Sequence, residues 1–222
     1  MHLEIPKQKL HSLKEFASHY LMIVLSILTA LGLEQWIEHV HHEQAAETAS
    51  RQIEAELAND LSEIKQSEQR NQENLTPLLE LDKLITADVK AGTDSKTINE
   101  HIQAHKQQFV ITISWPIFAS QAWDVAVANQ SVSWIPAERL NRYSGAYANQ
   151  RHVSTWLSQD STVLLSAPHM LDVRTQLELG RSVDPVDFVA VVRQMIVTMQ
   201  GAQSHLQQLE PQMMAALGKK TP

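Results

Sequence analysis

Residues 20–33 read YLMIVLSILTALGL, an apolar run without a charged side chain that follows a segment carrying three lysines. An α-helix that crosses the hydrocarbon core of a bilayer needs about 20 mostly apolar residues. The run alone is shorter, but its extension to residues 16–37 reaches this length. The extension also places Tyr20 and Trp36 near the ends, where aromatic side chains favour the membrane interface. We therefore expect residues 16–37 to form a transmembrane helix.

Two other interpretations of the run stay open at this point. A buried core helix of a soluble protein has a similar composition. A cleaved signal peptide also begins with a positive segment, and Ala30-Leu31-Gly32 offers small residues at the spacing that a signal peptidase requires. The helical pattern continues through this site with no breaker other than Gly32. A retained signal-anchor is therefore the main prediction.

Charge on the two flanks predicts the orientation. The N-terminal flank carries Lys7, Lys9 and Lys14, whereas four glutamates follow the run before the first arginine. Positive flanks remain in the cytoplasm. We expect residues 1–15 to be a short cytoplasmic head and residues 38–222 to be one extracytoplasmic domain, which in a bacterial inner membrane protein faces the periplasm.

Composition predicts an all-α protein and excludes one class of partner. The 222 residues are 43% hydrophobic and contain only 6 glycines, which is typical of helical proteins. The formal net charge is −7, and no cluster of lysine and arginine offers a footprint for phosphates. We expect no nucleic-acid binding. The chain contains no cysteine, so no disulfide contributes to stability.

After residue 37 the pattern becomes amphipathic. Apolar residues recur at steps of three and four, or their sums, up to about Gln69, with polar residues between them. This predicts a stalk helix over about residues 38–69, with an apolar stripe that pairs, in the manner of a coiled coil, with a later segment or a second copy. The stripe consists of Ile37, Val40, Ala46, Ala49, Ile53, Leu57, Leu61 and Ile64.

Three further helix signals follow the stalk. Thr76-Pro77 predicts a new helix start, and Thr97 with Glu100 forms a capping-box pattern. Asp184-Pro185 combines an N-cap with proline at the first helical position, shortly after Gly180, which is a typical helix-ending residue. Several long helices joined by short loops predict an antiparallel helical bundle.

Most of the tryptophans and tyrosines fall in the middle of the chain. Such a set most often forms part of a core, but it can also line a pocket for an apolar or cationic ligand. The candidate pocket residues are Trp115, Trp123, Trp134, Tyr143, Tyr147 and Trp156.

Histidines just beyond the apolar run are weak metal candidates. His39 and Glu43 lie four residues apart on one helical face, and His42 is adjacent. A zinc site needs three or four converging ligands, so a solvated surface patch is the simpler interpretation. We expect no metal or other cofactor.

Two segments of the chain carry a resemblance to other proteins. They are ILTALGLEQWIE, and AWDVAVANQSVSWIP with the LNRYSGAYANQ that follows it. They resemble a broad group of uncharacterised bacterial membrane-anchored proteins with an N-terminal hydrophobic span followed by a helical domain. The resemblance covers roughly residues 20–150. It implies retention of the anchor and brings no catalytic residue with it.

No nucleophile, phosphate-binding or dinucleotide-binding motif occurs in the sequence, so we expect no enzyme. The first hypothesis is an envelope interaction or scaffold protein that pairs with a protein partner or with itself. The second is a periplasmic ligand-sensing helical module, or a secreted ligand-binding domain if the N-terminal segment is cleaved. We see no second span or output domain in these 222 residues, and therefore favour the first.

Overall fold

The computed structural model describes residues 13–165 and 168–219. All secondary structure in these ranges is helical, as the composition predicts. The α-helices are α1 (Leu13–Ala91), α2 (Ser95–Ala104), α3 (Gln121–Ala128), α4 (Ala137–Leu165), α5 (Pro168–Glu178) and α6 (Pro185–Ala216). Two 3₁₀ turns, η1 (Lys106–Gln108) and η2 (Ser131–Trp134), lie between them. Most of the expected head, residues 1–15, lies outside the described residues.

Helix α1 is much longer than the expected stalk. It runs for 79 residues without interruption, so the helix end expected near Gln69 and the helix start expected at Thr76-Pro77 are both wrong. Pro77 lies inside the helix, where it removes one backbone hydrogen bond. The flanking Leu75 and Leu78 are buried in the core. We attribute the unbroken helix to this packing, which offsets the missing bond.

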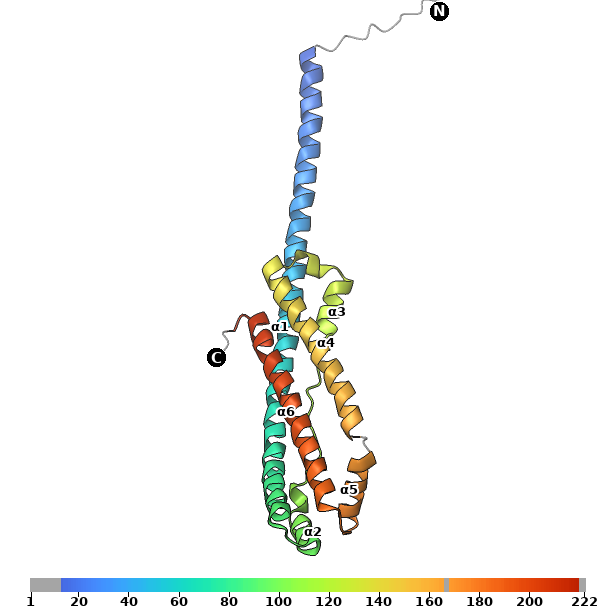
Figure 1. Cartoon of the computed structure of the whole chain (residues 1–222). Helices are drawn as coiled ribbons and strands as arrows, with labels where there is room; N and C mark the ends of the chain where they lie inside the picture. Colours follow the sequence, from blue (N-terminus) through green and yellow to red (C-terminus); the bar gives the residue numbers. More distant parts are fainter. Residues whose placement is uncertain (1–12, 166–167, 220–222) are drawn as a thin grey trace, which may run out of the picture.

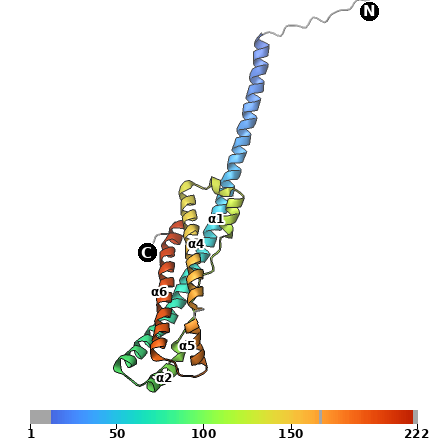
Figure 2. The ribbon, with the colours of Figure 1, turned by 45° about the vertical axis from the view of Figure 1, so that its right-hand side comes forward.

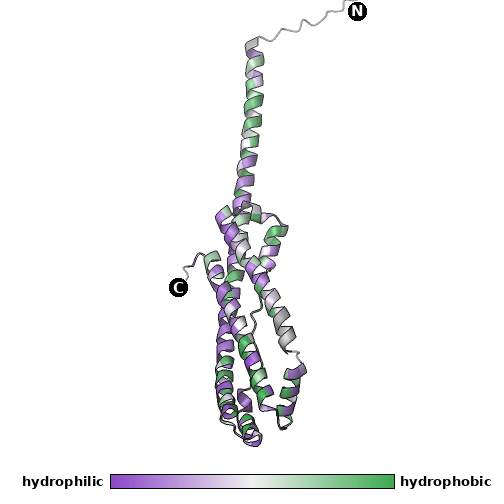
Figure 3. Cartoon of the chain, in the orientation of Figure 1, coloured by the Kyte–Doolittle hydropathy of each residue, from purple (hydrophilic) through white to green (hydrophobic). Residues whose placement is uncertain are grey.

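The first third of α1 projects alone from the rest of the molecule (Figure 1). Between Glu15 and His39 every side chain is exposed except the half-buried Val24. Figure 3 shows hydrophobic residues along much of this part of the helix, with hydrophilic ones toward its lower end. It is the one helix in the described chain that is long and apolar enough to cross a membrane, and its most apolar window is 0% buried. A helix that is apolar on all faces needs a nonpolar environment on all faces.

The remainder of α1 is the central helix of the domain, and α6 packs along it in the opposite direction. Three pairs along the two helices record this direction. Arg193 Nε donates to Asp82 Oδ1 at 2.7 Å, Gln203 pairs with Gln72 at 3.3 Å, and Lys65 with Glu210 at 3.2 Å. The core between them is almost entirely aliphatic and methionine side chains; it includes Ile53, Leu57, Ile64, Leu78, Leu81, Ile85, Val192, Met195, Met199, Leu206 and Met213.

Helix α4, in contrast, runs parallel to α1. Its residues 139, 143, 147 and 150 meet α1 at residues that rise from 47 to 60 in the same order. The chain therefore departs from a simple antiparallel order, because an extended connector between η1 and α3 carries it back toward the first end before α4 begins. Figure 2 shows α4 and α6 beside each other, and the two helices pack together.

The connector is extended without belonging to a sheet, and α1 side chains satisfy its backbone polar groups. Asn71 both accepts from Ser114 N at 2.7 Å and donates to Ser114 O at 2.9 Å, and Asn74 donates to Thr112 O at 3.0 Å. The segment FVITIS, residues 109–114, is therefore an extended connector held by side chains of α1. Backbone groups that lack a helix or sheet partner need such side-chain partners when water is excluded.

Local signals set the remaining helix ends. Asp184 caps α6 by accepting from Val186 N and Asp187 N, and Gly180 has a positive φ of 65°, so both predictions are confirmed. The N-cap of α2 is Asp94 instead of the expected Thr97, because the Asp94 carboxylate accepts from both Lys96 N and Thr97 N. The α5–α6 turn is held to α2 by Asn99, which bonds both the N–H and the carbonyl of Val183.

Candidate functional site

A ladder of carboxyl groups on α1 forms the most elaborate polar site in the described chain. Glu47, Glu54, Glu56 and Asp60 face α4 and the end of the connector. The two helices run in the same direction, so each successive turn of α4 presents a partner to the next carboxyl group. We call this set, with its partners Arg139, Tyr143, Tyr147 and Gln150, the carboxylate ladder.

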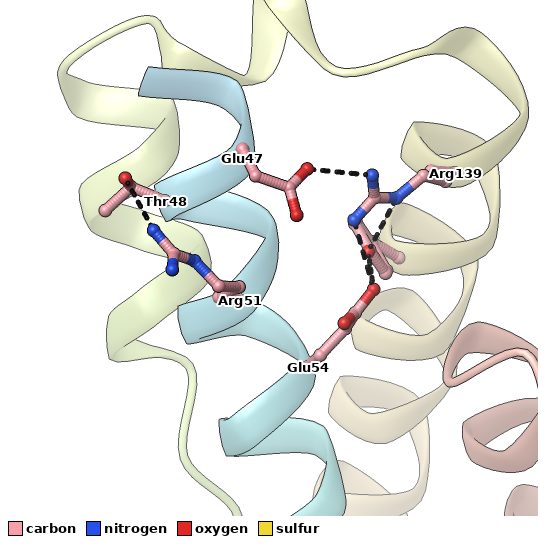
Figure 4. Close-up of polar contacts among 6 residues, drawn as sticks. Glu47, Thr48, Arg51, Glu54 and Arg139 are labelled. Carbon is pink, nitrogen blue, oxygen red and sulfur yellow. Dashed lines mark hydrogen bonds and ion pairs between the residues drawn. The ribbon is translucent and has the colours of Figure 1, made fainter. Parts of the chain in front are cut away.

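Arg139 forms the end of the ladder that lies nearer the projecting helix. Figure 4 shows its side chain reaching toward both Glu47 and Glu54. Its guanidinium contacts Glu47 at 3.2 Å and Glu54 at 3.3 Å, and its Nε donates to the Tyr143 hydroxyl at 3.2 Å. Tyr143 in turn donates to Glu54. The hydrogen bond to Tyr143 and those to the two carboxylates raise the pKa of Arg139 above its ordinary value. The group therefore stays charged at every pH at which the protein folds.

Tyr147 and Glu56 form the middle of the ladder. The Tyr147 hydroxyl donates to Glu56 Oε1 at 2.6 Å, and Glu56 Oε2 accepts from Ala122 N at 2.9 Å. Burial, together with the bond to Glu56, raises the pKa of Tyr147 above its ordinary range. Tyr147 remains a neutral donor, and Glu56 joins the first turn of α3 to α4.

Asp60 is the most enclosed acid of the ladder, with 2% of its surface exposed. One carboxylate oxygen accepts from Ala119 N at 3.2 Å, and the other accepts from Gln150 Nε2 at 2.9 Å. Burial raises the pKa of Asp60 to about 6, with a smaller contribution from the neighbouring Glu56 charge. Asp60 therefore changes protonation state about one pH unit below neutral.

These contacts fit a structural latch better than a catalytic centre. Each carboxyl group already holds a partner from another segment, and the ladder joins α1 to the connector, α3 and α4. General acid–base catalysis needs a group placed against a substrate atom, whereas the Asp60 carboxyl faces Gln150 and the connector backbone. The site can take up a proton at Asp60. Protonation would change the strength of the hydrogen bond by which Asp60 holds Ala119 of the connector.

The expected aromatic pocket residues lie in several places. Trp123 and Tyr147 are in contact, with ring centroids 5.3 Å apart, and Tyr143 is buried one turn earlier on α4. Trp115 packs partly buried against the core from the connector. Trp156 contacts His205 of α6 at 4.0 Å, and Trp134 stacks on His42. The structure thus brings together Trp123 and the two tyrosines and separates the other three tryptophans.

The candidate metal ligands His39, His42 and Glu43 do not converge on one point. His39 Nε2 lies 3.3 Å from Glu43 Oε1, but the His42 ring is stacked on Trp134 with centroids 3.6 Å apart. No group of three or more metal-binding side chains occurs among the described residues. Farther along the chain, His101 pairs with Asp88 at 2.7 Å.

Sequence reasoning missed the carboxylate ladder, although one signal for it was present. The apolar stripe of α1 passes through Ile53, Leu57 and Ile64, and Asp60 falls on the same face at helical spacing. An acid in a buried stripe needs a polar partner. That the partner is Gln150, 90 residues later, depends on the parallel placement of α4.

Comparisons with known proteins add no relative to this picture. Neither the profiles of known protein families, nor the curated proteins, nor the solved structures contain a match to the chain.

Proposed function

We propose that this protein is a single-pass membrane-anchored envelope protein whose helical domain serves as an interaction scaffold. The observation that carries the proposal is the continuity of α1. The same helix provides an apolar segment exposed on all sides and the central helix of the folded domain. In this proposal residues 16–37 cross the inner membrane, the N-terminal head is cytoplasmic and the domain lies in the periplasm.

A continuous helix gives the domain a defined height and orientation above the membrane. From Ile37 to Ala91 the helix rises about 80 Å at 1.5 Å per residue. No flexible linker separates the apolar segment from the folded part. A scaffold that must present a surface at a fixed distance from a bilayer needs this property, whereas a diffusing ligand-binding domain does not.

The end of the domain farthest from the projecting helix offers a surface for a protein partner or a second copy. The α5–α6 corner lies at this end (Figure 1). Leu179 in the turn and Val186 at the start of α6 are largely exposed there, and Leu171 of α5 is about half exposed. Exposed apolar side chains at the free end of a domain can serve as contact points for a partner. In this proposal the partner binds there.

The ligand-sensing alternative receives less support from the structure. It requires the aromatic residues to enclose one pocket, and three of the six tryptophan and tyrosine candidates are separated from the rest. A small molecule that raises the melting temperature of the purified protein would favour this alternative over the scaffold.

Two experiments test the proposal. Reporters active only in the periplasm or only in the cytoplasm, fused after Pro222, should give periplasmic activity, with the protein in washed membranes at its full 25.0 kDa. A shortened soluble product would overturn the anchor. For the partner surface, a photo-crosslinking residue at position 179 should give a discrete adduct in intact cells, whereas the same residue at the exposed position 141 on α4 should not. Equal labelling at both positions would overturn the proposed corner.

A further inference from the structure

We infer that the α3–η2 corner of the domain makes a second contact with the membrane. In this contact the Trp134 side chain lies in the headgroup layer of the bilayer. This inference depends on the proposed function, because it requires residues 16–37 to span the membrane. It adds that the domain touches the same bilayer from which its anchor emerges. The contact is apolar and aromatic, so its partner is the lipid interface itself.

The height of Trp134 follows from its contact with α1. The indole stacks on the His42 ring, with centroids 3.6 Å apart and planes inclined by 8°. His42 lies five residues beyond Ile37, or about 8 Å along the helix axis. The headgroup layer on each side of the hydrocarbon core is about 5–8 Å thick. Trp134 is therefore at the level of the headgroups whenever the span ends at Ile37.

The exposure of Trp134 is unexplained within the domain. It is 50% exposed, and the most exposed tryptophan of the chain, Trp36 at 63%, lies at the end of the expected span. The other three tryptophans pack against the core. An indole has an apolar body with one N–H donor, which is the combination that favours membrane interfaces.

The proposed contact is confined to the η2 end of this corner. Val125 and Val127 of α3 are each 47% exposed, but Val125 lines a surface hollow with Gln52, about 22 Å beyond Ile37 along the helix axis and above the headgroup layer. Figure 1 shows the segment between α3 and α4 at the end of the domain from which the bare helix emerges. The exposed charged groups nearby include Glu43, Asp124 and Glu138, which are acidic. We therefore expect binding at the interface without a requirement for anionic lipid.

Quenching by brominated lipid tests the contact in the full-length protein. We would reconstitute single-tryptophan variants that retain Trp36, Trp134 or Trp156 into phosphatidylcholine vesicles, with or without bromine near the headgroup end of the acyl chains. Emission from Trp36 and Trp134 should fall by at least a third in brominated vesicles, and emission from Trp156 should not change. The difference between wild type and Trp134→Phe supplies the same readout from a protein that keeps the other four tryptophans.

A matched insertion provides the control. Seven residues of helix-forming sequence placed between Glu38 and His39 preserve the facing of the domain but raise it by about 10 Å. This insertion should abolish the quenching of Trp134 and leave that of Trp36 intact.

Each other outcome has a definite meaning. Quenching of Trp36 with no quenching of Trp134 would overturn the second contact but would still support the membrane anchor. Absence of quenching at both positions would overturn the anchor itself. Equal quenching of Trp156 would overturn the geometry, because the domain would then lie along the membrane. Quenching of Trp134 that is absent in phosphatidylcholine vesicles and appears only when anionic lipid is added would overturn the apolar contact in favour of an electrostatic one.

Discussion

Asp60→Asn should convert a pH-sensitive contact of the carboxylate ladder into an insensitive one. Asp60 is 2% exposed, and burial raises its pKa to about 6 from the ordinary value of 3.8. Asparagine has nearly the same shape but carries no charge at any pH. The variant can still accept a hydrogen bond from Ala119 N, as the carboxylate does.

The sign and size follow from linkage between protonation and folding. The native state binds the proton with a pKa of about 6 and the unfolded chain with one near 3.8, so the native state holds more protons between these values. Stability therefore falls as the pH rises through this window and reaches its lower level above pH 6. Between pH 5 and pH 7.5 the loss through Asp60 is about 1.4 kcal/mol, or roughly tenfold in the folding equilibrium.

Chemical denaturation of the full-length protein in detergent micelles measures this effect. The free energy of unfolding of Asp60→Asn minus that of wild type should increase by about 1.4 kcal/mol from pH 5 to pH 7.5. Titration of the histidines cancels in this difference. Asp172→Asn, an exposed aspartate on α5, should follow wild type at every pH. A difference for Asp60→Asn that stays constant with pH would refute the assignment of a raised pKa to Asp60.

Three further substitutions test other parts of the structure by the same denaturation assay. Asn99→Ala should lower the free energy of unfolding by about 2–3 kcal/mol, because it leaves both backbone polar groups of the buried Val183 without a partner. Asn141→Ala, at an exposed position, is the control. Equal losses in the two variants would contradict the role of Asn99. Arg139→Ala should lower the free energy of unfolding by about 1–2 kcal/mol. Arg174→Ala removes an exposed ion pair within one helix and should lower it by less than about 0.5 kcal/mol. A loss at Arg139 no larger than that at Arg174 would show that the ladder adds no stability there. Pro77→Ala should stabilise the protein by about 1–3 kcal/mol, since it restores a hydrogen bond inside α1; a destabilised variant would mean that the packing depends on the proline ring.

Local chemistry made some elements predictable from the sequence. The N-cap at Asp184 and the helix end at Gly180 each depend on a few adjacent residues, and both occur as expected. The stripe of α1 was also correct over Ala46, Ile53, Leu57 and Ile64, all of which are buried. Pro77 was misread because a local rule for proline was outweighed by packing against α6, which is distant in sequence.

The carboxylate ladder could be predicted only in part. The position of Asp60 on the buried stripe indicates that it needs a partner. The identity of that partner depends on two nonlocal facts, namely the extended connector and the parallel direction of α4. The connector is held by Asn71 and Asn74, whose partners lie about 40 residues away, and no periodicity reveals such a pairing. The same reasoning explains why clustering of tryptophans in sequence did not produce one pocket.

Cysteine scanning along α1 tests the central claim, that one helix both crosses the membrane and forms the central helix of the domain. The chain contains no cysteine, so single cysteines from residue 13 to residue 60 each report on one position. In membranes holding the full-length protein, a water-soluble maleimide should fail to label about 20 consecutive positions ending near Trp36. Beyond Val40 labelling should recur with the helical period, strong at Glu47 and Thr48 and weak at Ile53. Uniform labelling through residues 20–33, or a protein that begins after Gly32, would contradict the claim.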